Sequence, residues 1–138
     1  MIFGMIERLR GWAMPYPFWL ASLGARGEYL VRRDFHRRGY HCLATNWRHR
    51  HGEIDLIVAN ARRLVFVEVK TRGGPEPPPI GDTISHDQKR RLRRLAEIYR
   101  NRWPARDVPW QFVLALVSVP RTDTRFCRGI RIQLADLF

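Results

Sequence analysis

The stretch GEIDLIVANARRLVFVEVKTR, Gly52–Arg72, decides the fold of this sequence. Residues 53–59 and 64–71 are two short runs rich in Ile and Val, as is typical of β-strands. Only the segment 60–63 separates them, so the two runs are expected to pair as a β-hairpin. The charged residues of this hairpin carry the most specific functional signal in the chain.

Side chains alternate between the two faces of a strand, and this sorts the residues of the hairpin. One face is entirely aliphatic and is expected to be core, with Ile54, Leu56, Val58, Val65, Val67 and Val69. On the opposite face all the charged groups gather at one end, namely Glu53, Asp55, Glu68 and Lys70. The sequence therefore predicts a charged end on an otherwise apolar hairpin.

A loop centred on 60–63 sets the register of the hairpin. It places Asp55 opposite Glu68 and Glu53 opposite Lys70. Directly opposed side chains have Cβ atoms about 4.5–5.5 Å apart, where two like charges destabilise a sheet. A divalent cation such as Mg²⁺ or Mn²⁺ would compensate the two carboxylates, because hard cations bind carboxylates, water and substrate phosphate. The alternative is a surface hairpin with Glu53 and Lys70 as an exposed ion pair.

Together these groups have the parts needed to hydrolyse a phosphodiester bond. A bound metal ion polarises a phosphoryl oxygen and lowers the pKa of water. Lys70 would stabilise the negative charge that develops on the phosphate, or orient the attacking water. The chain contains 23 Arg and only two Lys, which fits a position that needs a compact ammonium and not a guanidinium.

A helix is predicted ahead of the hairpin, from Ser22 as N-cap to about Arg38, with Gly39 as a stop. Its apolar stripe consists of Leu23, Leu30, Val31 and Phe35. Glu28 shares a face with part of this stripe and leans toward the core, where a carboxylate is costly unless paired or metal-bound. Glu28 is therefore a candidate third acid, with an ion pair to Arg32 one turn further on as the alternative.

The remaining chain predicts a mixed sheet flanked by helices. A Gly- and Pro-rich loop at 73–81 follows the hairpin, and a helix over 86–103 comes next, with an apolar stripe at helical spacing. Further strands are expected at 40–48, 111–119 and 129–134. The resulting order, α-β-β-β-α-β-β, indicates an α/β domain over residues 21–138, preceded by an extension at 1–20.

The charge of the chain indicates a polyanionic partner. Its 138 residues include 25 Lys and Arg against 13 Asp and Glu, a formal net charge of +12. So basic a surface favours binding to phosphates, because their neutralisation releases counterions. DNA is the partner that we expect, and an anionic membrane surface is the alternative.

Other features of the composition argue against several classes of protein. With 45% hydrophobic residues the chain is expected to be globular and not disordered. Cys42 and Cys127 are far apart and form no C-x-x-C motif, so neither a disulfide framework nor a structural zinc is indicated. The uncharged stretch 11–25 is short and broken by proline, so no bilayer span is predicted. The expected location is the cytoplasm.

The second predicted helix carries seven basic residues against two acidic ones, which favours phosphate contacts over a merely solvated face. The candidates for binding nucleic acid are Lys89, Arg90, Arg91 and Arg94. His49 and His51 would lie on one strand face. Without a third ligand nearby, contact with solvent or phosphate is favoured there over zinc.

The segment Gly27–Arg72, with GEIDLI at 52–57 and FVEVKTR at 66–72, resembles the bacterial YraN family of predicted endonucleases. That family belongs to the PD-(D/E)xK superfamily, which has the restriction-endonuclease-like fold, and is similar in layout to archaeal Holliday-junction resolvases. The resemblance extends over about residues 22–119.

The resemblance implies roles for four side chains and one backbone carbonyl of this segment. Asp55 and Glu68 would bind the metal ion together with the backbone carbonyl of Val69. Lys70 would be the catalytic lysine, and Glu28 the acid carried by the helix. Two departures concern substrate handling: family members typically have Lys-Gln at 88–89, where this chain has Gln-Lys, and an Asp at 113, where it has Val.

Two functions are compatible with these features. The first is an endonuclease that requires Mg²⁺ or Mn²⁺ and hydrolyses DNA, on branched or damaged forms in particular. The second is a non-catalytic nucleic-acid-binding module that keeps the nuclease fold. The intact set of Asp55, Glu68 and Lys70 favours the first. No membrane partner is expected, and the sequence leaves open whether two copies form a homodimer.

Overall fold

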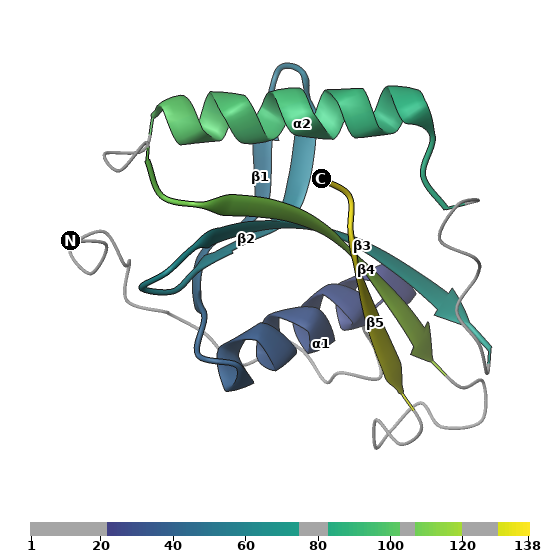
Figure 1. Ribbon diagram of the computed structural model, residues 1–138. Coiled ribbons are helices and arrows are strands. Elements are labelled where there is room, and N and C mark those ends of the chain that lie inside the picture. Colours follow the sequence, from purple (N-terminus) through teal and green to yellow (C-terminus); the bar gives the residue numbers. More distant parts are fainter. Residues whose placement is uncertain (1–21, 75–82, 103–106, 120–129) are drawn as a thin grey trace.

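The computed structural model describes residues 22–74, 83–102, 107–119 and 130–138. Within them lies a five-stranded sheet in the order β1-β2-β3-β4-β5, with helix α1 on one face and helix α2 on the other (Figure 1). The elements are α1 (Leu23–Arg37), β1 (His41–His49), β2 (Gly52–Ala59), β3 (Leu64–Gly73), α2 (His86–Asn101), β4 (Trp110–Val119) and β5 (Arg131–Asp136). This arrangement confirms the expected α/β, restriction-endonuclease-like fold.

The pairing of β3 with β4 makes the sheet mixed. These two strands are parallel over the whole of β3, whereas all other neighbouring strands are antiparallel. Parallel neighbours need a crossover connection, and α2, which lies between them in the sequence, provides it. From Phe112 onward β4 is buried throughout, as its apolar run predicts for a strand covered on both faces.

Helix α1 forms where its cap and its apolar stripe predict. The Ser22 hydroxyl accepts a hydrogen bond from the backbone N–H of Ala25 at 3.2 Å, which caps the first turn. Leu30, Val31 and Phe35 are buried against the sheet. The helix ends just before Gly39, whose φ of +85° is easily adopted only by glycine.

Gly27 lets α1 lie unusually close to β3. A Cβ atom at Gly27 would lie 1.7 Å from the Thr71 hydroxyl oxygen and 2.9 Å from its Cβ.

We expect Gly27→Ala to lower the free energy of unfolding by about 1–3 kcal/mol, the usual cost of overpacking a core. Urea denaturation measures this effect. Gly24→Ala is the matched control, because nothing lies within 4 Å of that position on the same helix; equal stability of the two variants would contradict the prediction.

Helix α2 covers the opposite face of the sheet. The Ser85 hydroxyl accepts a hydrogen bond from the backbone N–H of Gln88 at 3.2 Å and caps the helix. Tyr99 is half-buried, and the stripe residues that are fully buried are Leu92, Leu95 and Ala96. The helix ends at Asn101; the predicted end at Trp103 lies outside the described residues.

Next to its loop the hairpin of β2 and β3 has the predicted register, but the predicted cross-strand pair of Asp55 and Glu68 is wrong, because the ladder does not reach these residues. Ala59 pairs with Leu64, and the antiparallel ladder continues to the pair of Leu56 and Val67. The side chain of Asn60 accepts hydrogen bonds from the backbone N–H groups at the other end of the loop, which hold the turn. Both faces of this hairpin are core, one packed on α1 and the other on α2.

The prediction that Ile54 shares a face with Leu56 and Val58 is wrong. Ile54 packs on the α2 side of the sheet, and so does Trp47, its partner on β1. Asn46, directly before Trp47, has a φ of +48°, which breaks the regular alternation of the strand. The outer end of β1 and β2 therefore turns toward α2, and Figure 1 shows the tip of this pair of strands rising beside that helix.

Smaller differences concern the ends of elements. β3 continues through Gly73 because it pairs with β4 up to Val119, so the predicted loop begins later than expected. β5 lies slightly later in the chain than the predicted 129–134. Cys42 is half-buried, whereas the extension at 1–20 and Cys127 lie outside the described residues. Among the helices of the described part, none is long and apolar enough to cross a membrane.

Candidate metal centre and its surroundings

The strands β2 and β3 part at Asp55. The ladder between them ends at Leu56, and the next interaction is made by a side chain: Asp55 Oδ2 accepts a hydrogen bond from the backbone N–H of Val69 at 2.8 Å. The carboxylate of Asp55 thus takes the place of a backbone partner. This contact holds it beside the segment of β3 that carries Glu68 and Lys70.

Glu68 is a buried carboxylate with two partners, the ammonium of Lys70 and the side-chain amide of Gln88. Its residue is only 7% exposed. Glu68 Oε1 lies 3.0 Å from Lys70 Nζ and accepts a hydrogen bond from Gln88 Nε2 at 3.3 Å. Gln88 belongs to the first turn of α2, whose position is set by the Ser85 cap. The Glu68 carboxylate therefore joins β3 to the start of α2.

The predicted pairing of Glu53 with Lys70 is wrong. Glu53 Oε2 instead accepts from Arg48 Nε at 3.0 Å, across the β1–β2 pair, and Lys70 turns to Glu68. The reason is that the β2–β3 ladder has already ended at Leu56, so its register does not extend to these residues. The alternative of an exposed Glu53–Lys70 ion pair on a surface hairpin is thereby excluded.

Asp55 is protonated more easily than an ordinary aspartate. Burial and the negative charge of Glu68 raise its pKa from 3.8 to about 7. The hydrogen bond from Val69 opposes this rise, the charge of Glu28 adds to it, and Lys70 lowers the pKa again. The surroundings of Asp55 therefore disfavour its charged form.

Glu28 joins the same cluster from α1. Burial raises the pKa of Glu28, a hydrogen bond with the Asn46 side chain lowers it, and the charges of Glu53 and Glu68 raise it further. The charge of Glu28 is thus felt by the carboxylates of the sheet, and its role as a third acid stays a prediction.

The oxygen donors here suit a hard divalent cation. Among the described residues no three His, Cys, Asp or Glu side chains lie close enough together to hold a metal ion by themselves. Mg²⁺ does not require three, since it is usually bound by one or two carboxylates and keeps several waters. Asp55 and Glu68 could supply these, with the Val69 carbonyl as the further donor expected from the resemblance. The raised pKa of Asp55 supports this fit, because a cation would offset the repulsion between the carboxylates.

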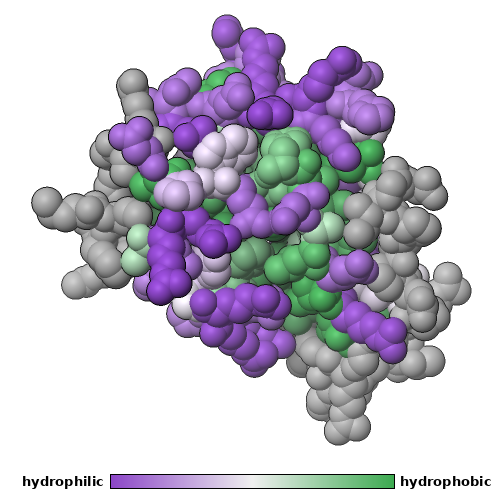
Figure 2. All heavy atoms as spheres, in the orientation of Figure 1, coloured by the Kyte–Doolittle hydropathy of each residue, from purple (hydrophilic) through white to green (hydrophobic). Residues whose placement is uncertain are grey.

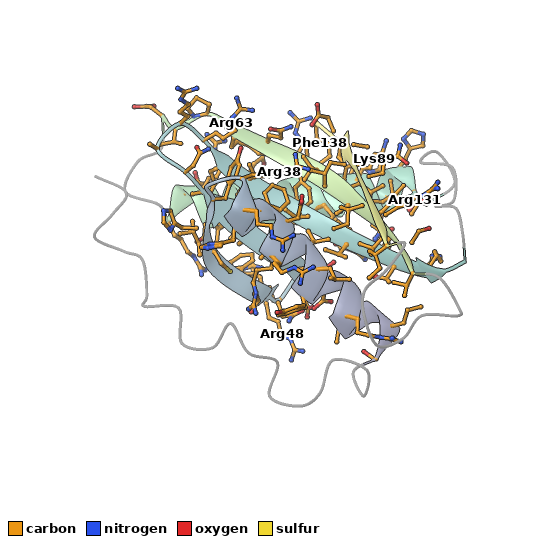
Figure 3. All side chains as sticks on the ribbon, turned by 90° about the horizontal axis from the view of Figure 1, so that it is seen from below. Arg38, Arg48, Arg63, Lys89, Arg131 and Phe138 are labelled. Atoms are coloured by element: carbon orange, nitrogen blue, oxygen red, sulfur yellow. The ribbon has the colours of Figure 1, made fainter. Side chains whose placement is uncertain are left out.

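The four basic candidates on α2 do not lie together. The stem of Arg91 lies beside Gly52, at the tip of the β1–β2 hairpin. Lys89 lines a shallow hollow with Phe138, near the end of the chain. Figure 3 shows Lys89 and Phe138 on one side of the molecule and Arg48 of β1 on the opposite side. The structure thus divides the predicted basic surface between two flanks of the helix.

The contacts of two polar residues of the site were not predicted from the sequence. Gln88 stands three residues after Ser85, in the S-x-x-Q spacing of a capping box, which indicated a helix start but not a contact with Glu68. Asn46 is a poor strand residue that tolerates positive φ, which marked an irregularity in β1. Their partners lie far away in the sequence, so spacing alone could not identify them.

Comparison with known proteins gives one consistent family. A model of the uncharacterised protein family UPF0102 matches residues 27–126. A UPF0102 protein of Nocardia farcinica is 42% identical over 103 residues, which cover 73% of this chain and 78% of that protein. One of Symbiobacterium thermophilum is 39% identical over 110 residues, covering 79% and 92%. One of Roseiflexus castenholzii is 37% identical over 99 residues, covering 70% and 79%.

Proposed function

The chain belongs to the uncharacterised protein family UPF0102, the YraN family that its sequence resembles, and on that premise we propose that it is a metal-dependent endonuclease acting on DNA. The observation that carries the proposal is the meeting of Asp55, Glu68 and Lys70 where β2 and β3 part. A surface hairpin without function has no need to hold a buried carboxylate and a half-buried one beside each other.

Each residue of the cluster has a role in this proposal. Asp55 and Glu68 would hold Mg²⁺ or Mn²⁺ with the Val69 carbonyl, and the bound ion supplies polarisation of a phosphoryl oxygen and a lower pKa for water. The Lys70 ammonium, held 3.0 Å from Glu68 Oε1, lies where it can contact a phosphoryl oxygen and stabilise developing negative charge. Gln88 keeps the Glu68 carboxylate oriented through its own hydrogen bond.

The charge of the protein supports DNA as the substrate. A net charge of +12 attracts a polyanion and speeds its association. Branched or damaged DNA is the form that we expect to be cut, since the layout resembles that of junction resolvases. With such a substrate we expect the protein to act in the bacterial cytoplasm.

Incubation of the purified protein with DNA tests this function. We expect nicking of supercoiled plasmid with Mg²⁺ or Mn²⁺ and none with EDTA, and faster cleavage of flapped or four-way DNA than of linear duplex. Metal should also raise the melting temperature, because a ligand that binds only the native state stabilises it. The proposal fails if metal neither stabilises the protein nor permits cleavage of any DNA form.

The alternative is a binding module that keeps the fold without cutting. The reversed Gln88–Lys89 pair and Val113 favour it, because both depart from the pattern of the family. The same experiment separates the two functions. A binding module would bind DNA, with or without metal, and leave every substrate intact.

A further inference from the structure

The arginines of α2 differ in whether a carboxylate neutralises them. Arg90 pairs with Asp87, and Arg93 Nε lies 3.8 Å from Glu97 Oε1. Arg91 and Arg94 are exposed and form no ion pair with any carboxylate of the described residues. Figure 2 shows hydrophilic side chains gathered over α2, so the helix is charged along its outer surface, but only part of that charge is unpaired.

The tip of the β1–β2 hairpin brings further basic groups to the unpaired arginines. A Cβ at Gly52 would lie 3.5 Å from Arg91 Cδ and 3.7 Å from its Nε, so the turn packs directly on the arginine stem. Gly52 has a φ of +139°, which other residues rarely adopt, so glycine is what permits this approach. Arg50 Nε donates a hydrogen bond to His51 Nε2 at 3.3 Å in the same turn.

The electrostatics of this tip suit an anion and not a cation. Partial burial and the nearby charges of Arg94 and Arg50 lower the pKa of His51. The one acidic residue close by in the sequence, Glu53, is held by Arg48. A metal ion at His49 and His51 would be repelled by the same arginines, which argues against the zinc alternative.

We propose that Arg50, His51, Arg91 and Arg94 form a binding site for a backbone phosphate of the nucleic acid, separate from the metal centre. This inference rests on the proposed function and extends it. The two sites adjoin: Gly52 is three residues from Asp55 on β2, and Arg91 follows Gln88 by three residues, about 4.5 Å along α2. A DNA strand that reaches Lys70 and Glu68 would therefore pass the tip of the hairpin and place a neighbouring phosphate there.

The proposal predicts that two double variants, each lacking two arginines, differ in their affinity for DNA. Arg91→Gln with Arg94→Gln should weaken binding of duplex DNA at least tenfold. Removal of a single phosphate contact should lower the slope of log K against log salt by about 0.9. The matched control is Arg38→Gln with Arg93→Gln, which removes the same charge from two arginines that pair with Asp34 and Glu97 on their own helices. We expect the control to bind within about twofold of wild type.

Fluorescence anisotropy in EDTA, with labelled duplex and single-stranded DNA as separate arms, measures these affinities and slopes. A loss in the duplex arm alone assigns the site to the duplex backbone, and an equal loss in both arms assigns it to the backbone of one strand. An equal loss in the two double variants would overturn the proposal. The two proposals can also be separated. If the two double variants differ in DNA affinity as predicted but wild type does not cut DNA with metal, the nuclease function is wrong and the phosphate site is retained.

Discussion

Lys70→Ala is expected to slow DNA cleavage at least about a hundredfold while metal still raises the melting temperature. The Lys70 ammonium is proposed to stabilise charge on the phosphate, and loss of one such group typically costs a factor of about 10²–10³. Its ion pair with Glu68 Oε1, at 3.0 Å, is not part of the set of metal donors. Initial rates of plasmid nicking and melting curves with and without Mn²⁺ measure the two effects.

Lys70→Arg distinguishes a chemical role from a simple need for positive charge. The guanidinium is a broad planar fork, which does not occupy the position of a compact ammonium. We therefore expect the arginine variant to recover only a small part of the rate, although it retains the charge. Full activity in the arginine variant, or undiminished cleavage in the alanine variant, would remove Lys70 from the reaction.

Asp55→Asn is expected to stabilise the metal-free protein at pH 8 and to abolish its response to metal. The folded state raises the pKa of Asp55 from 3.8 to about 7, so it binds the proton more tightly than the unfolded chain does. The stability that comes from neutral Asp55 is present below about pH 4 and is lost as the pH rises toward 7. Asn cannot ionise and avoids this loss, while its side-chain oxygen can still accept from Val69.

The size of this effect follows from the pKa shift. One pKa unit corresponds to about 1.4 kcal/mol, and because Asp55 keeps some contact with solvent we discount the full shift to about 2 kcal/mol. Urea denaturation in EDTA from pH 4 to pH 8 should show equal stability of the two proteins at pH 4 and a growing advantage of the variant above it. With Mn²⁺ at pH 8 the order should reverse, since only wild type gains stability. A difference that does not change with pH would contradict the assigned burial of Asp55.

Local features of the sequence were sufficient for the elements and for the pairing of the hairpin. The alternation of apolar residues and the short polar loop at 60–63 determine the register from Ala59–Leu64 to Leu56–Val67. Ser22 and Gly39 likewise mark the ends of α1. These features depend on residues that are close together in the chain, and the covalent connection between such residues restricts their geometry. The alternation along the two strands likewise singled out Asp55, Glu68 and Lys70 as candidate site residues, although not their contacts.

Their actual contacts were decided by tertiary structure. The turn of β1 and β2 toward α2 moved Ile54 to the other face, and the parting of the strands at Asp55 ended the register on which the Glu53–Lys70 pair depended.

Partners far apart in the sequence then replaced the expected neighbours. Gln88 donates a hydrogen bond to Glu68, and the tip of the β1–β2 hairpin at Gly52 packs on Arg91. Such contacts depend on how a helix and a sheet pack, which is governed by burial of both apolar faces at once and not by any local spacing.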